Sequence, residues 1–168
     1  MNAEGQILAG SFEGFLWIRV VGKGSFQNSP AMKSYIDQSQ AEGSLVIVDL
    51  EACTGLDSTF MGTLTGLALR AREQNRGDLQ VVNADKRNFR LLKGLGLDQI
   101  FPVRPDVGDF SAQQKQVCHA LEEADRKASC QEERARHMLE AHEALGEVDE
   151  ENKGRFRDVV SLLRESLD

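Results

Sequence analysis

The sequence predicts an α/β fold with a largely parallel sheet, followed by a C-terminal helical extension. Strand-like and helix-like segments alternate over residues 1–105, which is typical of parallel strands joined by right-handed crossovers. The run Leu45–Val48 is continuously apolar, as expected for a strand that is covered on both faces. The composition then changes near Pro105, because all three prolines lie at or before it and amphipathic helical spacing dominates beyond it.

The length of the chain indicates how many domains it holds, and its charge indicates which partners to expect. The chain has 168 residues, which suits one domain of ordinary size or a small domain with an appendage. Its net charge of −7 falls entirely in residues 106–168, because residues 1–105 hold 11 Lys/Arg and 11 Asp/Glu. Neither part is basic, so we expect no nucleic-acid partner.

The sequence also indicates where the protein acts. No apolar run approaches the ~20 residues of a membrane span, and residues 1–5 do not resemble the start of a secretory signal. Cys53, Cys118 and Cys130 are too few and too scattered for a disulfide framework. We therefore expect a protein of the reducing cytoplasm with no membrane span.

The first elements are two strands and a helix. Residues 7–9 and 15–21 have strand character, and Gly14 between them makes a hairpin plausible. A helix then starts at Ser29, because Pro30 suits a first helical turn, and Gly43 ends it.

The strand at Leu45–Val48 is followed by Asp49 and by a loop over residues 51–56. A second helix is predicted from Asp57–Ser58 to Gly77, with apolar residues at helical spacing. The remaining elements are expected in this order: a strand over residues 79–82, a short helix capped by Asp85 and closed by Gly94 and Gly96, and an edge strand over residues 100–103.

Residues 109–168 predict three amphipathic helices. The second opens at Ser129 with the spacing of a capping box and ends at Gly146, and the third begins near Asn152. Each helix has an apolar stripe that must be covered. Three coverings are open: the chain's own domain, a second copy in a homodimer, or another protein.

The histidines and cysteines are poorly spaced for a metal site. His119, His137 and His142 all lie in the tail with Cys118 and Cys130, and no CxxC, HExxH or ExxH pattern brings ligands to one side. We expect surface or half-buried histidines, and neither a metal nor another cofactor.

Enzymatic chemistry is not expected either. Ser58 follows a strand and a loop, but its surroundings are not GxSxG, and no histidine precedes His119 to act as its base. Only a histidine brought in from the tail, beside a deep polar cleft, would favour catalysis. The Gly22–Gly24 and Gly94–Gly96 steps lack the spacing of a phosphate-binding loop.

Ser58 is instead well placed for regulation. It opens a helix, where free N–H groups and the helix dipole favour an anion, although capping alone would also explain Asp57 or Ser58 there. A phosphate on Ser58 would add about −1.5 to −2 charges, which the helix end tolerates and a partner resting on it does not. The position therefore suits a charge switch at an interface.

Several segments together resemble the STAS domain of bacterial anti-sigma factor antagonists, over roughly residues 5–105. The family pattern is an apolar strand ending in Asp-Leu, then a loop, then Asp-Ser-Ser/Thr opening a helix, and later a Leu-x-x-x-Gly-Leu segment followed by Ile-Phe. The matching segments here are Leu45–Glu51, Asp57–Thr59 with Gly62, Leu79–Val82, Phe89–Leu97 and Ile100–Phe101.

The resemblance implies a STAS-like mixed, mostly parallel sheet with four helices on one side, the fourth over about Ser111–Ala128. It implies that Ser58, or alternatively Thr59, is phosphorylated by an anti-sigma factor that is itself a serine kinase. Unphosphorylated protein would bind this kinase, phosphorylated protein would not, and a PP2C-type serine phosphatase would reset the switch. We accordingly divide the chain into a STAS domain over residues 1–128 and a helical extension over residues 129–168.

The predicted partner surface comprises Asp57, Ser58, Thr59, Phe60 and Met61. Asp57 is expected to cap the helix. Family members usually have a glycine soon after the Asp-Ser pair, whereas here Phe60 and Met61 come before Gly62. Phe60 is expected to be exposed and to alter the surface that the partner contacts. Asp49 is expected to shape the floor of the site.

The extension over residues 129–168 has no counterpart in the family pattern, so it could form a homodimer or mask the Ser58 face. The alternative function is a STAS scaffold or adaptor, in stress signalling or beside a transporter, that is not phosphorylated. Such a protein would dimerise through its C-terminal helices, with Ser58 serving only as a cap.

Overall fold

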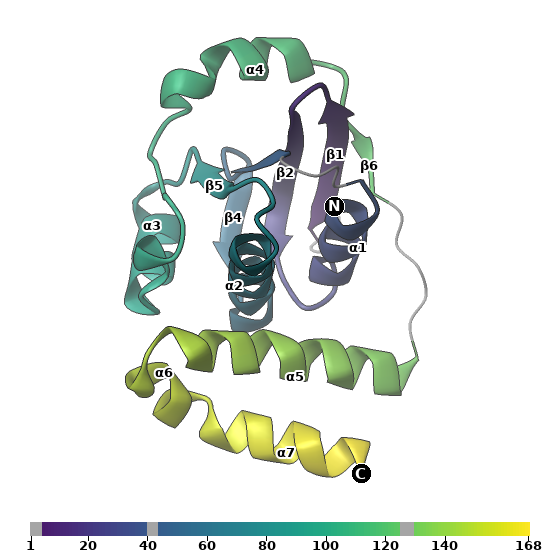
Figure 1. Ribbon diagram of the computed structural model, residues 1–168, viewed down its shortest axis with the longest axis vertical. Helices are drawn as coiled ribbons and strands as arrows, with labels where there is room; N and C mark the ends of the chain where they lie inside the picture. Colours follow the sequence, from purple (N-terminus) through teal and green to yellow (C-terminus); the bar gives the residue numbers. More distant parts are fainter. Residues whose placement is uncertain (1–4, 40–43, 125–129) are drawn as a thin grey trace.

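A computed structural model describes residues 5–39, 44–124 and 130–168 (Figure 1). Its strands are β1 (Gln6–Phe12), β2 (Phe15–Gly24), β3 (Leu45–Asp49), β4 (Cys53–Leu56), β5 (Leu79–Val82) and β6 (Glu122–Glu123). Its helices are α1 (Ser29–Ser39), α2 (Ser58–Glu73), α3 (Lys86–Gly94), α4 (Ser111–Val117), α5 (Gln131–Val148), α6 (Glu150–Arg155) and α7 (Arg157–Leu167). The predicted α/β class with a C-terminal helical extension is confirmed.

The sheet is mixed and mostly parallel, with the strand order β5-β3-β2-β1-β6 and with β4 added to the end of β2. β1 and β2 form the predicted antiparallel hairpin, and Gly14 at its turn has a φ of +87°, which favours glycine. β2, β3 and β5 are parallel neighbours, so the buried run of β3 lies in the middle of the sheet.

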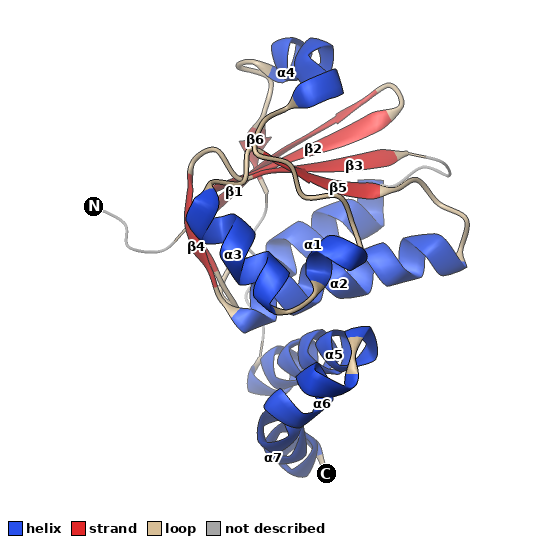
Figure 2. Cartoon of the chain, turned by 90° about the vertical axis from the view of Figure 1, so that its left-hand side faces the viewer, coloured by secondary structure: helices blue, strands red, loops and turns tan. Residues whose placement is uncertain are grey.

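Alternating residues of the strands build two cores, one on each face of the sheet. Leu16 and Ile18 of β2 point into the larger core, which α1 and α2 cover. Trp17 points to the opposite face, where Val117 at the end of α4 covers it (Figure 2). α4 thus lies on the face of the sheet opposite α1 and α2, whereas the family resemblance placed four helices on one side.

Several local expectations are corrected. The predicted loop at residues 51–56 contains β4, and the predicted edge strand at residues 100–103 makes only one bridge, between Val103 and Val81. α4 ends at Val117, well before Ala128, and His119 just beyond it has a φ of +70°. Gly146 does not end the second tail helix, because α5 continues to Val148.

The start of α5 differs slightly from the capping box expected at Ser129. Cys130 is the N-cap residue and accepts a hydrogen bond from the backbone N–H of Glu133. Ser129, Gly43 and the boundary between the two segments at residues 128 and 129 lie outside the described residues.

The C-terminal helices form an additional layer. α5 packs across α2 on the side away from the sheet, and α6 and α7 lie beyond α5 (Figure 2). Among the described residues, no helix is both long enough and apolar enough to cross a membrane.

Candidate functional site

Asp57 fixes the start of α2, as predicted. One of its carboxylate oxygens accepts a hydrogen bond from the backbone N–H of Phe60 at 2.8 Å, which makes Asp57 the N-cap. The other oxygen accepts from the backbone N–H of Phe26 at 2.9 Å. A single side chain therefore joins the β2–α1 loop to the helix end that carries Ser58.

Ser58, the first residue of α2, is half-buried and contacts the tail. Its Oγ lies 2.9 Å from Nε2 of His142, and Nδ1 of that ring lies 2.7 Å from the carbonyl oxygen of Met138. Because a carbonyl oxygen only accepts, Nδ1 carries the ring proton and Nε2 accepts the hydroxyl proton of Ser58. His142 is only 4% exposed, and its ring packs edge-on against Phe156.

A second histidine of α5 also meets hydroxyl groups of the domain. Nε2 of His137 lies 2.8 Å from Oγ of Ser29, the first residue of α1, and 3.2 Å from Oγ1 of Thr63. Burial lowers the pKa of His137 to about 4, and nearby Lys33 acts in the same direction while Asp57 opposes it. His137 is therefore neutral in the docked tail at ordinary pH.

Between these two histidines, the backbones of α2 and α5 come very close. A Cβ atom added to Gly62 would lie 2.2 Å from the carbonyl oxygen of Ala141 and 2.9 Å from its Cβ. One turn further along α2, a Cβ added to Gly66 would lie 3.6 Å from Cβ of Ala144, which is an ordinary contact. Gly62 is thus needed for this packing, and Gly66 is not.

Three residues of the predicted partner surface are buried. Thr59 is 3% exposed, Phe60 is fully buried and Met61 is 5% exposed. The expectation that Phe60 is exposed is wrong, because its ring lies against the place where a Cβ of Gly24 would sit, inside the larger core. In this form of the chain, Asp57 and Ser58 are the members of the predicted surface that retain partial exposure.

Asp49 does not form the floor of this site. It is fully buried, and its carboxylate accepts hydrogen bonds from Trp17, Arg19, Asn83 and the backbone N–H of Glu51. Because residues alternate along β3, Asp49 points with Trp17 to the face opposite α2. Its role is to satisfy these donors within the domain.

Phe26 is a residue that the sequence analysis missed. It is 44% exposed and sits beside Asp57 through the backbone hydrogen bond described above. It lies in the stretch between Gly24 and Ser29, which has no helical or strand periodicity, so no pattern signalled it. Phe26 thus adds an exposed aromatic side chain to the loop that Asp57 joins to the start of α2.

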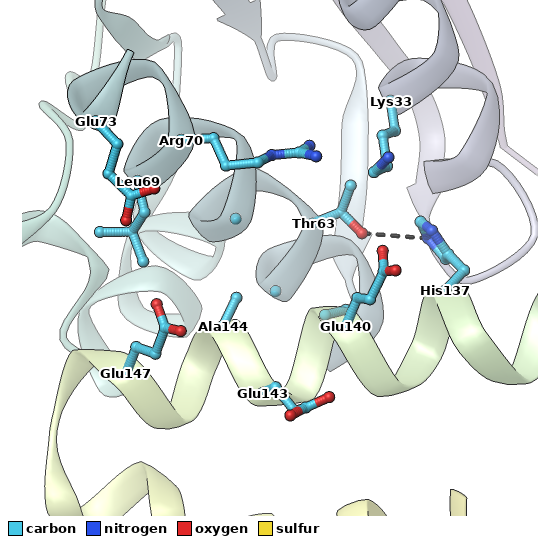
Figure 3. A pocket seen from close by; sticks show the side chains of 13 residues that line it. Lys33, Thr63, Leu69, Arg70, Glu73, His137, Glu140, Glu143, Ala144 and Glu147 are labelled. Atoms are coloured by element: carbon cyan, nitrogen blue, oxygen red, sulfur yellow. Dashed lines mark hydrogen bonds between the residues drawn. The ribbon is translucent and has the colours of Figure 1, made fainter. Parts of the chain in front are cut away.

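A pocket of about 370 Å³ lies beside the α2–α5 contact (Figure 3). Lys33 and Arg70 enter it from the domain, and Glu140 enters it from α5. Both cations pair with Asp37, at 3.1 and 3.8 Å. Glu73 of α2 also lines the pocket, so the domain side carries charges of both signs.

The Ser58–His142 pair has the proton arrangement of a nucleophile with its base, yet other parts of such a site differ. A backbone carbonyl rather than a carboxylate orients the ring, and the pair is enclosed in a helix contact. Neither the pocket of Figure 3 nor a second pocket, between α5 and α7, is lined by Ser58. Within the described residues, no group of three or more His, Cys, Asp or Glu is arranged to hold a metal ion.

Comparison with known proteins identifies the family of the α/β domain. A family model described as "STAS domain" matches residues 6–110. The chain belongs to the STAS family. The resemblance noted from the sequence is thereby confirmed, and α5–α7 lie outside the matched region.

Solved structures agree on this fold. An anti-sigma factor antagonist from Mycobacterium paratuberculosis is 21% identical, with 68% of this chain and 97% of that chain covered and a TM-score of 0.54. A sulfate transporter family protein from Wolinella succinogenes is 16% identical, with 66% and 92% covered and a TM-score of 0.52. At these identities the likeness shows the fold alone. No curated protein matches the chain significantly.

Proposed function

We propose that this chain is a non-enzymatic phospho-switch of the anti-sigma factor antagonist type, with Ser58 as the phosphate acceptor. The unphosphorylated chain binds an anti-sigma factor that is a serine kinase, and phosphorylation of Ser58 releases it. A PP2C-type serine phosphatase restores the binding form.

The observation that carries the proposal is the position of Ser58 at the N-terminus of α2 in a STAS domain. Free N–H groups and the helix dipole stabilise a phosphate at such an end. Thr59, the alternative acceptor, is 3% exposed, whereas Ser58 is half-buried. Of the two hydroxyl groups, only that of Ser58 lies near the surface, which favours Ser58 as the acceptor.

The surroundings of Ser58 also support a partner surface there. Phe26 gives an exposed aromatic ring, and Asp57 holds its backbone beside the helix end. A partner resting on this end would have to desolvate the added dianion, so phosphorylation would weaken binding without refolding the domain.

The cysteines are compatible with a cytoplasmic site of action. Cys53 is a buried free thiol, and Cys118 and Cys130 are exposed free thiols. Free thiols persist in reducing compartments.

The test uses candidate anti-sigma factor serine kinases and ATP. After incubation, mass analysis of peptides is expected to find one phosphate, on Ser58. Phosphate on residues other than Ser58 and Thr59 would refute the proposed switch. In binding assays, Ser58→Asp is expected to lower affinity for the kinase at least about tenfold, whereas the neutral Ser58→Asn is expected to retain most of it.

A scaffold without phosphorylation is the second candidate. The hydrogen bond from Ser58 to the buried ring of His142 favours it, because the hydroxyl is already engaged. In that case no kinase would modify Ser58, and the tail helices would join two chains. Light scattering on the intact chain would then give the mass of a dimer.

A further inference from the structure

The hydroxyl of Ser58 and the α5 helix occupy the same face of α2. His142 receives the hydroxyl proton of Ser58, and four residues further along α2 the backbone of Ala141 lies against Gly62. In Figure 2 the α5–α7 layer lies across α1 and α2 on the side away from the sheet. The chain therefore covers its own candidate partner surface.

From this arrangement we infer that α5–α7 form a cover that acts in cis: α5 competes with the partner and with the kinase for the Ser58 end of α2. Ser58 becomes available only in an open form, in which α5 has left α2. This inference rests on the proposed function for the identity of the competitor, but the cover itself can be tested without any partner.

A phosphate on Ser58 is incompatible with the closed form. The 2.9 Å separation between Oγ and Nε2 leaves no room for a phosphoryl group. Phosphorylation therefore requires α5 to move, and the phosphate then prevents it from returning to the same contact.

The contacts of the tail allow it to leave without unfolding the domain. Most are polar or involve small residues: the hydrogen bonds of His137 and His142, the approach of Ala141 to Gly62, and the bond from Asn152 to the carbonyl oxygen of Leu95 at 2.9 Å. Leu145 is the one large apolar side chain of the described tail that is fully buried. The larger core under α2 is built mainly from the domain itself.

The charges beside the α2–α5 contact also hold the tail only weakly. Glu140 of α5 points into the pocket beside the contact, toward the side that holds Lys33 and Arg70 of the domain (Figure 3). Attraction across a solvent-filled pocket is weak and screened by salt. It guides α5 toward α2 without locking it there.

The test measures the accessibility of position 58 in the full chain. Ser58→Cys is introduced with the exposed Cys118 and Cys130 changed to Ser, which is also a good N-cap at position 130. Cys53 can stay, because burial raises the pKa of its thiol and keeps it unreactive. The rate of maleimide labelling at residue 58, read by peptide mass analysis, reports the open form.

Two glycine variants of this chain form a matched pair. The methyl group added by Gly62→Ala would clash with the backbone of Ala141. This variant should therefore open the cover and raise the labelling rate about tenfold or more. Gly66→Ala makes the same chemical change in the same helix without a clash, so it should leave the rate unchanged. His142→Ala, which removes the direct contact with position 58, should also raise the rate.

Equal labelling of the parent, Gly62→Ala and Gly66→Ala chains would overturn the cover, and so would an equal rise in both variants. The circular dichroism of each chain verifies that it is folded. Incubation of the same glycine variants, with Ser58 intact, with a kinase and ATP separates the two proposals. If labelling follows the predicted order but no chain accepts phosphate on Ser58, the cover stands and the phospho-switch is refuted.

Discussion

In the α/β domain, the sheet and its helices bury large apolar side chains, whereas α5–α7 meet that domain mainly through small and polar groups. Trp17, Ile18 and Leu64 of the domain are fully buried, while α7 has no buried residue and leaves Leu162 66% exposed. The whole net charge of −7 also lies in residues 106–168. The domain therefore has a large apolar core of its own, and the tail is attached to it through fewer buried apolar side chains.

The largest expected effect comes from truncating a large apolar side chain in the core of the domain. Ile18→Ala should lower the free energy of unfolding by about 3 kcal/mol, because it leaves a cavity in a central strand. Leu145→Ala should loosen the tail and change the unfolding of the domain by less than about 1 kcal/mol. Urea unfolding followed by circular dichroism checks both. Equal losses would mean that the domain and the tail unfold as one cooperative unit, and that the tail is not the more weakly attached part.

The attachment of the tail should weaken in acid. The pKa of His137 is lowered from 6.5 to about 4 when the tail is docked, so its contribution is intact above about pH 6.5 and is lost as the pH falls toward 4. Each pKa unit corresponds to about 1.4 kcal/mol, and solvent screening reduces this, so we expect a loss of about 1–2 kcal/mol.

NMR signals of α5 recorded between pH 7.5 and 5 would follow this loss. The charged groups that face His137 include Lys33 and Asp57 of the domain, and Arg70 and Glu140 line the same pocket. His137→Gln removes the titrating ring, so the response should flatten. The same pH response in both chains would exclude His137 as its cause.

Removing the cap of α2 should have a smaller effect. Asp57→Ala loses two acceptors, for Phe60 and Phe26, and should cost about 1 kcal/mol of stability. Asp85→Ala removes the corresponding cap of α3 and should cost about as much. Only Asp57→Ala should also weaken kinase binding, as measured by calorimetry. If both variants bind equally well, the α2 end is not the partner surface.

The smallest effect is expected at the outer face of the tail. Leu162 is exposed, so Leu162→Glu should change stability by less than about 0.5 kcal/mol and leave the mass measured by light scattering unchanged. A lower mass for the variant would show that α7 joins two chains, which would favour the scaffold alternative.

The strands and helices with strong periodicity could be predicted from the sequence, and weaker elements could not. β3 and α2 follow clear apolar patterns, whereas β6 is two glutamates paired with β1 through the backbone. β4 is a four-residue strand that contains Gly55, so its side chains gave no strand signal. Gly146 lies inside α5 because tertiary packing outweighs the modest cost of a helical glycine.

The helix start that carries the candidate site could be predicted from the sequence, but its surroundings could not. Asp57 and Ser58 could be placed at a helix start, and the burial of Phe60 could have been read from its helical spacing with Leu64, Leu67 and Ala71. The contact between Ser58 and His142 could not be predicted from the sequence. An apolar stripe shows that a helix must be covered, but it does not show which element covers it. The approach of Gly62 to Ala141 involves no distinctive side chain.

Hydrogen exchange on the intact chain, with and without a bound anti-sigma factor kinase, tests the shared surface most directly. We predict that in the complex the amides of α5 lose protection by about tenfold or more, because α5 then lacks its packing against α2. The first turn of α2, at Ser58, should gain protection at the same time. Unchanged protection of α5 in a complex that protects Ser58 would contradict the account, because partner and tail would then not compete.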